Sequence, residues 1–569
     1  MPAVILAAIG LAMIFIGYRF YSKFIAEKIY QLDPDFETPA HSMRDDIDYV
    51  PTNRVVLWGH HFTAVAGAAP IIGPGIAVIW GWLPAFLWVT IGTMFFAGIH
   101  DFGAVWASVR NRAKSVGALT GDVVSPRARN LFMVVVFFLL MMVNAVFGVA
   151  IADAFQETPS SVIPAWTAIV VAVAIGVLIY RMHVPILWPT IAGTVILYAV
   201  IFLGDAVPIS LADGLFGLAP GAQWIIILFV YAGIASLLPV WLLLQPRDYI
   251  NGIQLFIGLG LLYGAVLIAN PTIVAPAINA NVPASAPPIF PLLFVTIACG
   301  AISGFHGLVG SGTTSKQLNK ETDARFVGYL GSSGEGALAL VAIIAATAGF
   351  ASLTEWEAMY SEFGNGGLAA FVQGGAVIVA SGVGISQEFA TTLLTVMAVL
   401  FAGTTMDAGV RLQRYIIQEW GSIYGIPVLQ NGYVATAAGV AACLLLAFGA
   451  GGPSGEGGML IWPLFGTTNQ LLAGLTLLVI SVMLVKLGRP ARYALTPMIF
   501  ITTMALAAAL VQLRTLFLQG RDAGWPGGGL FYPLLLIDIV IVFLAIFVML
   551  EAGSAFMREK RAATASASP

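Results

Sequence analysis

Histidines and carboxylates lie inside apolar stretches of this sequence, where a charged group is costly unless it has a partner. His60 and His61 adjoin in VVLWGHHFTAV, His306 lies in AISGFHGLVGSG, and Glu335 lies in GSSGEGALALVAII. Histidine titrates nearest physiological pH and can exchange a proton there. We predict that these four residues couple proton movement to function, with Glu335 alternating between protonated and charged forms. The alternative for each histidine is a hydrogen-bonded packing role.

Hydroxyl side chains follow His306 in the sequence GSGTTSKQ. Thr313, Thr314 and Ser315 could supply oxygen ligands to a coupling ion, and Lys316 comes directly after them. An ammonium group there could take the place of a sodium ion, which would suit proton coupling; the alternative is that Lys316 extends to the membrane surface. We predict that Lys316 is the cationic partner of Glu335, because a hairpin brings their helices together.

The same histidines could instead bind a metal. His60, His61 and His306 have no carboxylate at a recognisable ligand spacing to complete a metal site, so no cofactor is expected. A bound metal on these three residues remains an alternative.

Three further ionisable residues are candidates for gating. Asp101 lies near the inner end of an apolar run, where the alternative is a salt bridge with an arginine such as Arg110. Asp407 and Arg411 lie in TTMDAGVRLQRY at the spacing of an intrahelical ion pair. We assign Asp407 and Arg411 to an inner gate.

The composition indicates the solvent around these residues. Of the 569 residues, 59% are hydrophobic and 9% are charged, against roughly 25% charged in soluble domains. Apolar runs of about 18 residues or more recur along the chain, and each could cross a bilayer core. The sequence therefore predicts an all-α polytopic membrane protein. The net charge is −3, and no basic cluster suits nucleic acid.

We expect about 15 spans, and most lysines and arginines fall in one alternate set of loops. The other set holds only Arg514 and Arg521, which predicts an outer N-terminus and an inner C-terminus. To keep this order, the apolar stretch 366–385 must be a re-entrant or interfacial helix. The glycine-rich stretch 450–458 could be a lid or a turn. The expected spans are 3–22, 54–78, 83–108, 130–152, 162–181, 185–203, 222–244, 252–269, 289–316, 326–350, 386–405, 432–449, 459–484, 494–513 and 530–552.

Two expected spans, 54–78 and 222–244, contain small residues and prolines that would interrupt a helix. They run in opposite directions at matching positions, which is typical of secondary transporters built from inverted repeats, with substrate bound near the midplane. The alternative is a pair of ordinary proline kinks at packed interfaces. Free amides at a break could bind a carboxylate. The predicted substrate-binding residues are Gly67, Ala68, Ala69, Pro70, Gly73, Pro74 and Pro239.

Three long motifs closely resemble the carbon starvation protein A (CstA) family: NRVVLWGHHFTAVAGAAPIIGPGIA, SGFHGLVGSGTTSKQLNKETDARFVGYLGSSGEG and FAGTTMDAGVRLQRYIIQEW. The resemblance runs from about Tyr30 to the last helices. It implies the fold of the amino acid–polyamine–organocation superfamily, a LeuT-type 5+5 inverted repeat with additional helices, in a bacterial cytoplasmic (inner) membrane. The implied regions are an N-terminal helix and loop (1–53), a core (54–430) with repeats 54–203 and 222–405, and C-terminal helices (431–569).

Members of that family are described as uptake systems for peptides or for pyruvate, and the pyruvate members are thought to be proton symporters. The resemblance therefore implies import of pyruvate or a similar small carboxylate by proton symport, with proton-coupled peptide import as the alternative. A membrane metalloprotein that uses the histidines is a third hypothesis. No Walker-type GxxxxGK[ST] motif is present, so we expect neither ATP hydrolysis nor another enzyme activity. The sequence leaves the substrate, sodium against proton coupling, and the oligomeric state open.

Overall fold

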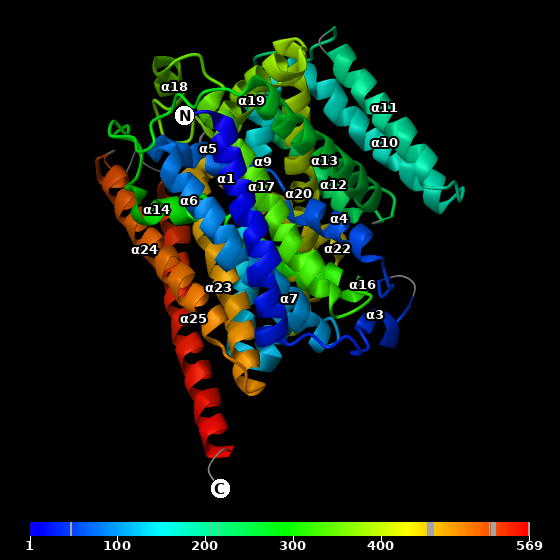
Figure 1. The fold of residues 1–569 in the computed structure, drawn as a ribbon, viewed down its shortest axis with the longest axis vertical. Helices are drawn as coiled ribbons and strands as arrows, with labels where there is room; N and C mark the ends of the chain where they lie inside the picture. Colours follow the sequence, from blue (N-terminus) through cyan, green and yellow to red (C-terminus); the bar gives the residue numbers. More distant parts are fainter. Residues whose placement is uncertain are drawn as a thin grey trace.

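The computed structural model is an assembly of helices that run mostly side by side along one axis (Figure 1). It describes residues 1–566 except 46–47, 205, 215–216, 240, 452–459, 523 and 525–530, so the stretch 450–458 lies largely outside the described residues. Within the described ranges, thirteen helices are long and apolar enough to cross a membrane, or 14 if a bent pair of helices is counted as one span. The prediction of an all-α polytopic membrane protein is confirmed.

The termini lie at opposite ends of the assembly (Figure 1). Several of the long helices extend well beyond the length that a bilayer core requires, which is about 20 residues. The longest members of the bundle are α9, α20 and α25. The spanning helices are α1 (Ala3–Ile16, extended by α2, Ser22–Phe24), α6 (Trp82–Gly92) with α7 (Gly98–Arg110), α9 (Pro126–Glu157), α10 (Val162–Tyr180), α11 (Leu187–Gly204), α12 (Pro220–Leu237), α13 (Leu244–Ala269), α17 (Leu330–Ala348), α20 (Gln387–Ile423), α22 (Gly432–Gly451), α23 (Trp462–Lys486), α24 (Arg492–Asp522) and α25 (Phe531–Ser566).

Short helices complete the chain at the ends of the bundle and in its connections. The helices α10 and α11 form a hairpin at one side (Figure 1), whereas almost every residue of α23 is buried. The short helices are α3 (Pro39–Ser42), α8 (Val116–Leu119), α16 (Ser315–Gln317), α18 (Leu353–Met359) and α21 (Pro427–Gln430).

The first interrupted span has the form that the sequence predicts. Helix α4 (Arg54–Val65) ends before Ala66, and α5 (Ala69–Ala77) resumes at an angle of 51° to it. Two prolines, Pro70 and Pro74, follow the break; Pro70 lies in the first turn of α5, where its missing N–H is no loss. The sequence around the break therefore favours two separate helices within this span.

The second interruption lies elsewhere than predicted. The stretch expected as one span over 289–316 consists of α14 (Ile289–Thr296), a non-helical segment 297–303, and α15 (Gly304–Val309), which continues through a π turn into α16. By contrast, the predicted break within 222–244 is the connection between two helices: α12 ends at Leu237 and α13 begins at Leu244.

The two interrupted spans pack against each other. A Cβ added at Gly73 of α5 would lie 2.5 Å from the carbonyl oxygen of Thr296, where α14 ends. The free carbonyls at this second break accept hydrogen bonds from side chains: Trp462 donates to Thr296 and Trp88 to Ile297, each at 3.0 Å. Such compensation is what allows irregular backbone within a membrane span.

The stretch 366–385 forms a short apolar helix, α19 (Gly367–Val383). At 17 residues it is shorter than the spanning helices, and it packs against α5, α13, α17 and α20. Close approach depends on glycine, because a Cβ at Gly374 would lie 2.0 Å from the carbonyl oxygen of Ala345. Whether α19 is re-entrant remains a prediction.

Candidate proton-carrying site

Four ionisable side chains form a continuous buried chain in the interior. The Nδ1 atom of His100 lies 2.7 Å from one carboxylate oxygen of Asp101, and the other oxygen lies 2.8 Å from Nδ1 of His306. The Nε2 atom of His306 lies 3.2 Å from Glu335, within ion-pair distance but without hydrogen-bond alignment. All four side chains are at most 1% exposed. The order is therefore His100, Asp101, His306 and Glu335.

Both ends of this chain have unused capacity for hydrogen bonding. Nε2 of His100 and Oε1 of Glu335 are buried without a partner among the described residues. A buried polar atom without a partner costs roughly 1–3 kcal/mol. A chain of carboxylates and imidazoles with open ends can hold or pass a proton, since imidazole both accepts and donates.

Irregular turns and glycines bring the chain together. A π turn precedes α7, which carries His100 and Asp101, another follows α15, which carries His306, and a third precedes α17, which carries Glu335. Such turns change the direction of side chains and are frequent at functional sites. A Cβ at Gly328 would lie 2.8 Å from the Phe102 backbone. The small residues thus let α17 approach α7 closely enough for the two carboxylates to share His306.

His61 joins the site from another direction. Its Nδ1 atom lies 2.8 Å from the Thr314 hydroxyl, its Nε2 atom is buried without a described partner, and its ring packs on Gly331. His60 is only partly buried. Thus His61 and His306 lie in the predicted region, but they contact different partners.

The predicted oxygen ligands are otherwise occupied or turned away. Ser315 donates to the carbonyl of Ser311 at 2.8 Å and accepts from Ser108 at 2.9 Å. Thr313 is exposed. The three hydroxyl groups therefore do not converge on one point.

The predicted pairing of Lys316 with Glu335 is wrong. Lys316 lies 3.3 Å from Asp48 and 5.4 Å from the centre of the Tyr49 ring, both in the loop before α4. Its side chain is 26% exposed. Because the backbone turns after α15, the lysine faces this loop, and His306 takes the place beside Glu335.

Asp101 also differs from its expected surroundings. The alternative partner Arg110 pairs with Glu321 instead, with Nη2 of Arg110 donating at 2.8 Å. The sequence missed His100, although the histidine–aspartate pair inside an apolar run was an available signal. A gating role for Asp101 stays a prediction.

No three histidine, cysteine or carboxylate side chains among the described residues are placed to hold one metal ion. His60, His61 and His306 in particular do not converge, since His61 faces Thr314 and His306 faces carboxylates.

The residues predicted to bind substrate divide into two groups. Gly67, Ala68, Ala69, Pro70, Gly73 and Pro74 are all buried at the first break. A Cβ at Gly67 would lie 2.5 Å from the Thr405 hydroxyl, so the break contacts α20. Pro239 is exposed in the connection between α12 and α13 and does not join this group.

The two predicted gating residues of α20 do not pair with each other. Asp407 forms a short ion pair with Arg247 of α13 and accepts a hydrogen bond from Tyr231 of α12 at 2.8 Å. Arg411 donates to the carbonyls of Ala235 and Leu238, each at 2.8 Å, at the end of α12. Arg247 itself is 3% exposed.

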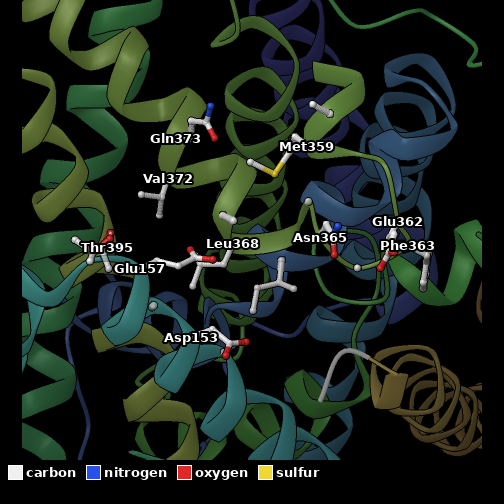
Figure 2. A pocket seen from close by; sticks show the side chains of 18 of the residues that line it. Asp153, Glu157, Met359, Glu362, Phe363, Asn365, Leu368, Val372, Gln373 and Thr395 are labelled. Carbon is white, nitrogen blue, oxygen red and sulfur yellow. The ribbon is translucent and has the colours of Figure 1, made fainter. Parts of the chain in front are cut away.

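A cavity of about 890 Å³ opens between α9, α18, α19 and α20 (Figure 2). Asp153 and Glu157 of α9 line one side, and Glu362, Asn365 and Gln373 line the side formed by α18, α19 and their connection (Figure 2). Ile72 of α5 also lines it, so the cavity reaches the first interrupted span. Among the described residues that line the cavity, none is a lysine or an arginine.

Comparisons with known proteins agree with the motifs. The family described as carbon starvation protein CstA matches residues 2–359 and 351–508. A peptide transporter CstA of Bacillus subtilis is 32% identical, with 96% of this chain and 97% of that protein covered. A pyruvate/proton symporter, BtsT of Escherichia coli, is 31% identical, with 83% and 76% covered.

A solved manganese transporter of Eremococcus coleocola aligns with 90% of this chain and 99% of its own, at 10% identity and a TM-score of 0.47. The match that determines the family is the one in sequence, which spans nearly the whole chain. This chain belongs to the CstA family of carbon starvation proteins.

Proposed function

We propose that this protein is a secondary active transporter that imports pyruvate or a similar small carboxylate together with protons. The single observation that carries the proposal is the buried chain of His100, Asp101, His306 and Glu335. Titratable groups in membrane spans are costly and functional by default. The named relatives include a pyruvate/proton symporter, which supports proton coupling at this site.

The interrupted spans support a transport route beside that chain. Interrupted helices commonly line the substrate site of secondary transporters. Here α4 and α5 meet the break between α14 and α15, and His306 lies just after that second break. Substrate at the first break and a proton on His306 would therefore occupy neighbouring elements, so the binding of one can alter the position of the other.

We place the protein in a bacterial cytoplasmic membrane, with the N-terminus outside and the C-terminus inside. The support is the distribution of lysine and arginine among the loops, which follows the positive-inside rule. The acidic cavity would then open outward, because it lies beyond the end of α17 that follows Ala348. We expect no enzyme activity, in line with the transporter names of the relatives.

Peptide import is the second candidate, and the acidic cavity favours it. A volume of about 890 Å³ can hold a short peptide. Carboxylates of Asp153, Glu157 and Glu362 would attract the ammonium group of a peptide, whereas they would repel a simple anion. The relative from Bacillus subtilis is named a peptide transporter.

Uptake into liposomes tests the two candidates together. The purified protein is reconstituted, an inward proton gradient is imposed, and uptake of labelled pyruvate is measured with and without unlabelled di- and tripeptides. Gradient-driven uptake that ignores peptides supports pyruvate symport. If labelled peptides accumulate and pyruvate does not, the second candidate holds. If neither is transported with a gradient, the proposed function is wrong.

A further inference from the structure

A second cluster of charged residues lies away from the histidines, between α12, α13 and α20. At its centre is the guanidinium of Arg247, 3% exposed, which pairs with Asp407. Its Nη1 atom also donates to the Tyr231 hydroxyl at 2.7 Å. Ion pairs at this burial are costly to form and strongly destabilising to break by removal of one partner. Such a pair can be structural, or it can hold an arginine ready for another anion.

Only one nitrogen atom of the guanidinium, Nη1, takes part in these contacts. Nη1 makes every hydrogen bond that Arg247 forms with described residues, and Nε is buried without a partner. The Nε–Nη2 edge of arginine is a planar fork that matches a carboxylate with two parallel hydrogen bonds. The edge suited to a carboxylate is therefore the one without a described acceptor.

The facing helix places a glycine directly against that edge. The residue opposite Nη2 is Gly403 of α20, and a Cβ added there would lie 2.5 Å from Nη2. Asp407 is likewise only half used, because Oδ1 is buried without a described partner while Oδ2 binds Arg247 and Tyr231. Arg411, the neighbouring arginine, donates to two backbone carbonyls through Nη2. Nε of Arg411 is also buried without a described partner, so of these two arginines Arg247 is the one in which neither Nε nor Nη2 has a described acceptor.

The cluster lies beside the first interrupted span. A Cβ at Gly252, five residues after Arg247 on α13, would lie 2.5 Å from the Thr63 hydroxyl of α4. A Cβ at Gly67, in the break itself, would likewise lie 2.5 Å from the hydroxyl of Thr405. Thr405 is two residues before Asp407 on α20. The helices that carry Arg247 and Asp407 are therefore the ones that flank the break. A substrate at the break would lie within about one to two helical turns of the guanidinium along these helices.

We infer that Arg247 binds the carboxylate of the transported substrate, and that Asp407 holds the guanidinium in place until the substrate arrives. The inference rests on the proposed function and deepens it. A carboxylate is the group that pyruvate and the C-terminus of a peptide share, so one receptor serves either candidate. Asp407 then competes with the substrate for the same cation, and Tyr231 keeps both side chains aligned.

Binding measurements on the purified full-length protein test this inference without a proton gradient. The probes are pyruvate, its uncharged amide pyruvamide, and a dipeptide, each titrated by calorimetry at fixed pH. The variants are Arg247→Lys, which keeps the charge but loses the fork, and Asp407→Asn, which keeps the shape but loses the competing charge. Arg514→Lys, an exposed arginine on α24, is the matched control. Size-exclusion chromatography checks that each variant is folded.

We expect Arg247→Lys to weaken binding of the carboxylate probe about tenfold or more, because a charge-assisted hydrogen bond is lost. Its preference for pyruvate over pyruvamide should fall toward one. Asp407→Asn should bind the carboxylate at least as tightly as the unaltered protein, since a competitor is removed, while its uptake falls. Arg514→Lys should change nothing. A merely structural pair predicts instead that both variants weaken binding equally.

The outcomes separate the inference from the proposed function. If the unaltered protein binds and transports pyruvate or the dipeptide but Arg247→Lys binds it unchanged, or if Asp407→Asn weakens binding as Arg247→Lys does, the inference is overturned and the proposed function stands. Should Arg247→Lys prove unfolded, Gly403→Ala replaces it: the added Cβ must displace Nη2, and unchanged carboxylate affinity overturns the inference. If the unaltered protein neither binds nor transports any probe, the proposed function itself fails.

Discussion

The role of His306 depends on its position between two carboxylates. Asp101 lies 2.8 Å from one ring nitrogen and Glu335 lies 3.2 Å from the other. A cationic imidazolium would be balanced by both neighbours, so His306 is suited to hold a proton within the membrane. Removal of either carboxylate changes that balance without changing the ring.

For His306→Gln we expect loss of proton-driven accumulation with substrate exchange retained. Glutamine keeps a polar side chain of similar length but has no titratable group. The measurement compares uptake under an imposed proton gradient with exchange of labelled for unlabelled substrate in its absence. His41→Gln is the matched control, because His41 is exposed and lies 2.9 Å from an asparagine side chain. Equal gradient dependence in His306→Gln and the unaltered protein would exclude His306 as the proton carrier.

Lys316, unlike His306, is expected to contribute little to proton-driven uptake. Since Lys316 faces Asp48 and is partly exposed, Lys316→Ala removes a surface ion pair worth roughly 0–1 kcal/mol. We expect uptake and its proton dependence to stay within about twofold of the unaltered protein. The initial rate of uptake at several external pH values measures this. Loss of most of the proton-driven uptake in Lys316→Ala would restore Lys316 to the coupling site.

At the scale of elements, the packing of one interrupted span on the other is the feature that positions the site. Gly73 of α5 approaches the carbonyl at the end of α14, and Trp462 of α23 donates to that same carbonyl. The approach leaves no room for a side chain. Small residues at such crossings allow helix backbones to meet.

Gly73→Ala should therefore destabilise the protein and reduce uptake. The added Cβ would lie 2.5 Å from the Thr296 oxygen, a backbone atom that cannot move independently, and overpacking of this kind costs typically about 1–3 kcal/mol. Gly59→Ala on α4 is the control, because a Cβ there meets nothing within 4 Å. Thermal unfolding in detergent and initial uptake rates are measured for both. A Gly73→Ala protein as stable and as active as Gly59→Ala would show that the two spans separate readily.

The sequence predicted the membrane fold and the first break because both depend on local chemistry. Apolar length predicts spans, and Pro70 and Pro74 with their neighbouring small residues predict an interruption. The partners of Glu335 could not be predicted the same way. They depend on how residues 297–303 unwind and on π turns that rotate the following side chains, and neither has a distinct pattern in the sequence.

His100 shows the same limit at one position. The adjacent ionisable pair marks the position as a candidate, but the contact between His100 and Asp101 and the link from Asp101 to His306 depend on the tertiary structure. Arg247 is not among the predicted site residues, because its partners lie on other helices. Only the tertiary structure brings it under Tyr231 and beside Asp407.

For the whole molecule, charge is distributed unequally between the two ends of the bundle. The acidic cavity follows the C-terminal end of α17, where Glu355 and Glu362 lie. The N-terminal end of the same span is preceded by Lys316, which binds Asp48. Because Arg325–Ala348 is 24 residues long, these two groups are separated by about one bilayer core. By the positive-inside rule, the acidic end faces outward.

Labelling of single cysteines in intact cells tests this orientation. Glu362→Cys should react with a membrane-impermeant maleimide from outside, whereas Asp48→Cys should react only after the cells are permeabilised. The native cysteines, Cys299 and Cys443, are buried and should give little background, and a variant with both replaced by serine controls for them. The physical reason is that translocation of loops rich in lysine and arginine is disfavoured, which fixes every later loop once the first spans are inserted. If the two positions label in the reverse order, the orientation of the protein in the membrane is the opposite of the one proposed. The acidic cavity would then open to the cytoplasm and serve as an exit instead of an entrance.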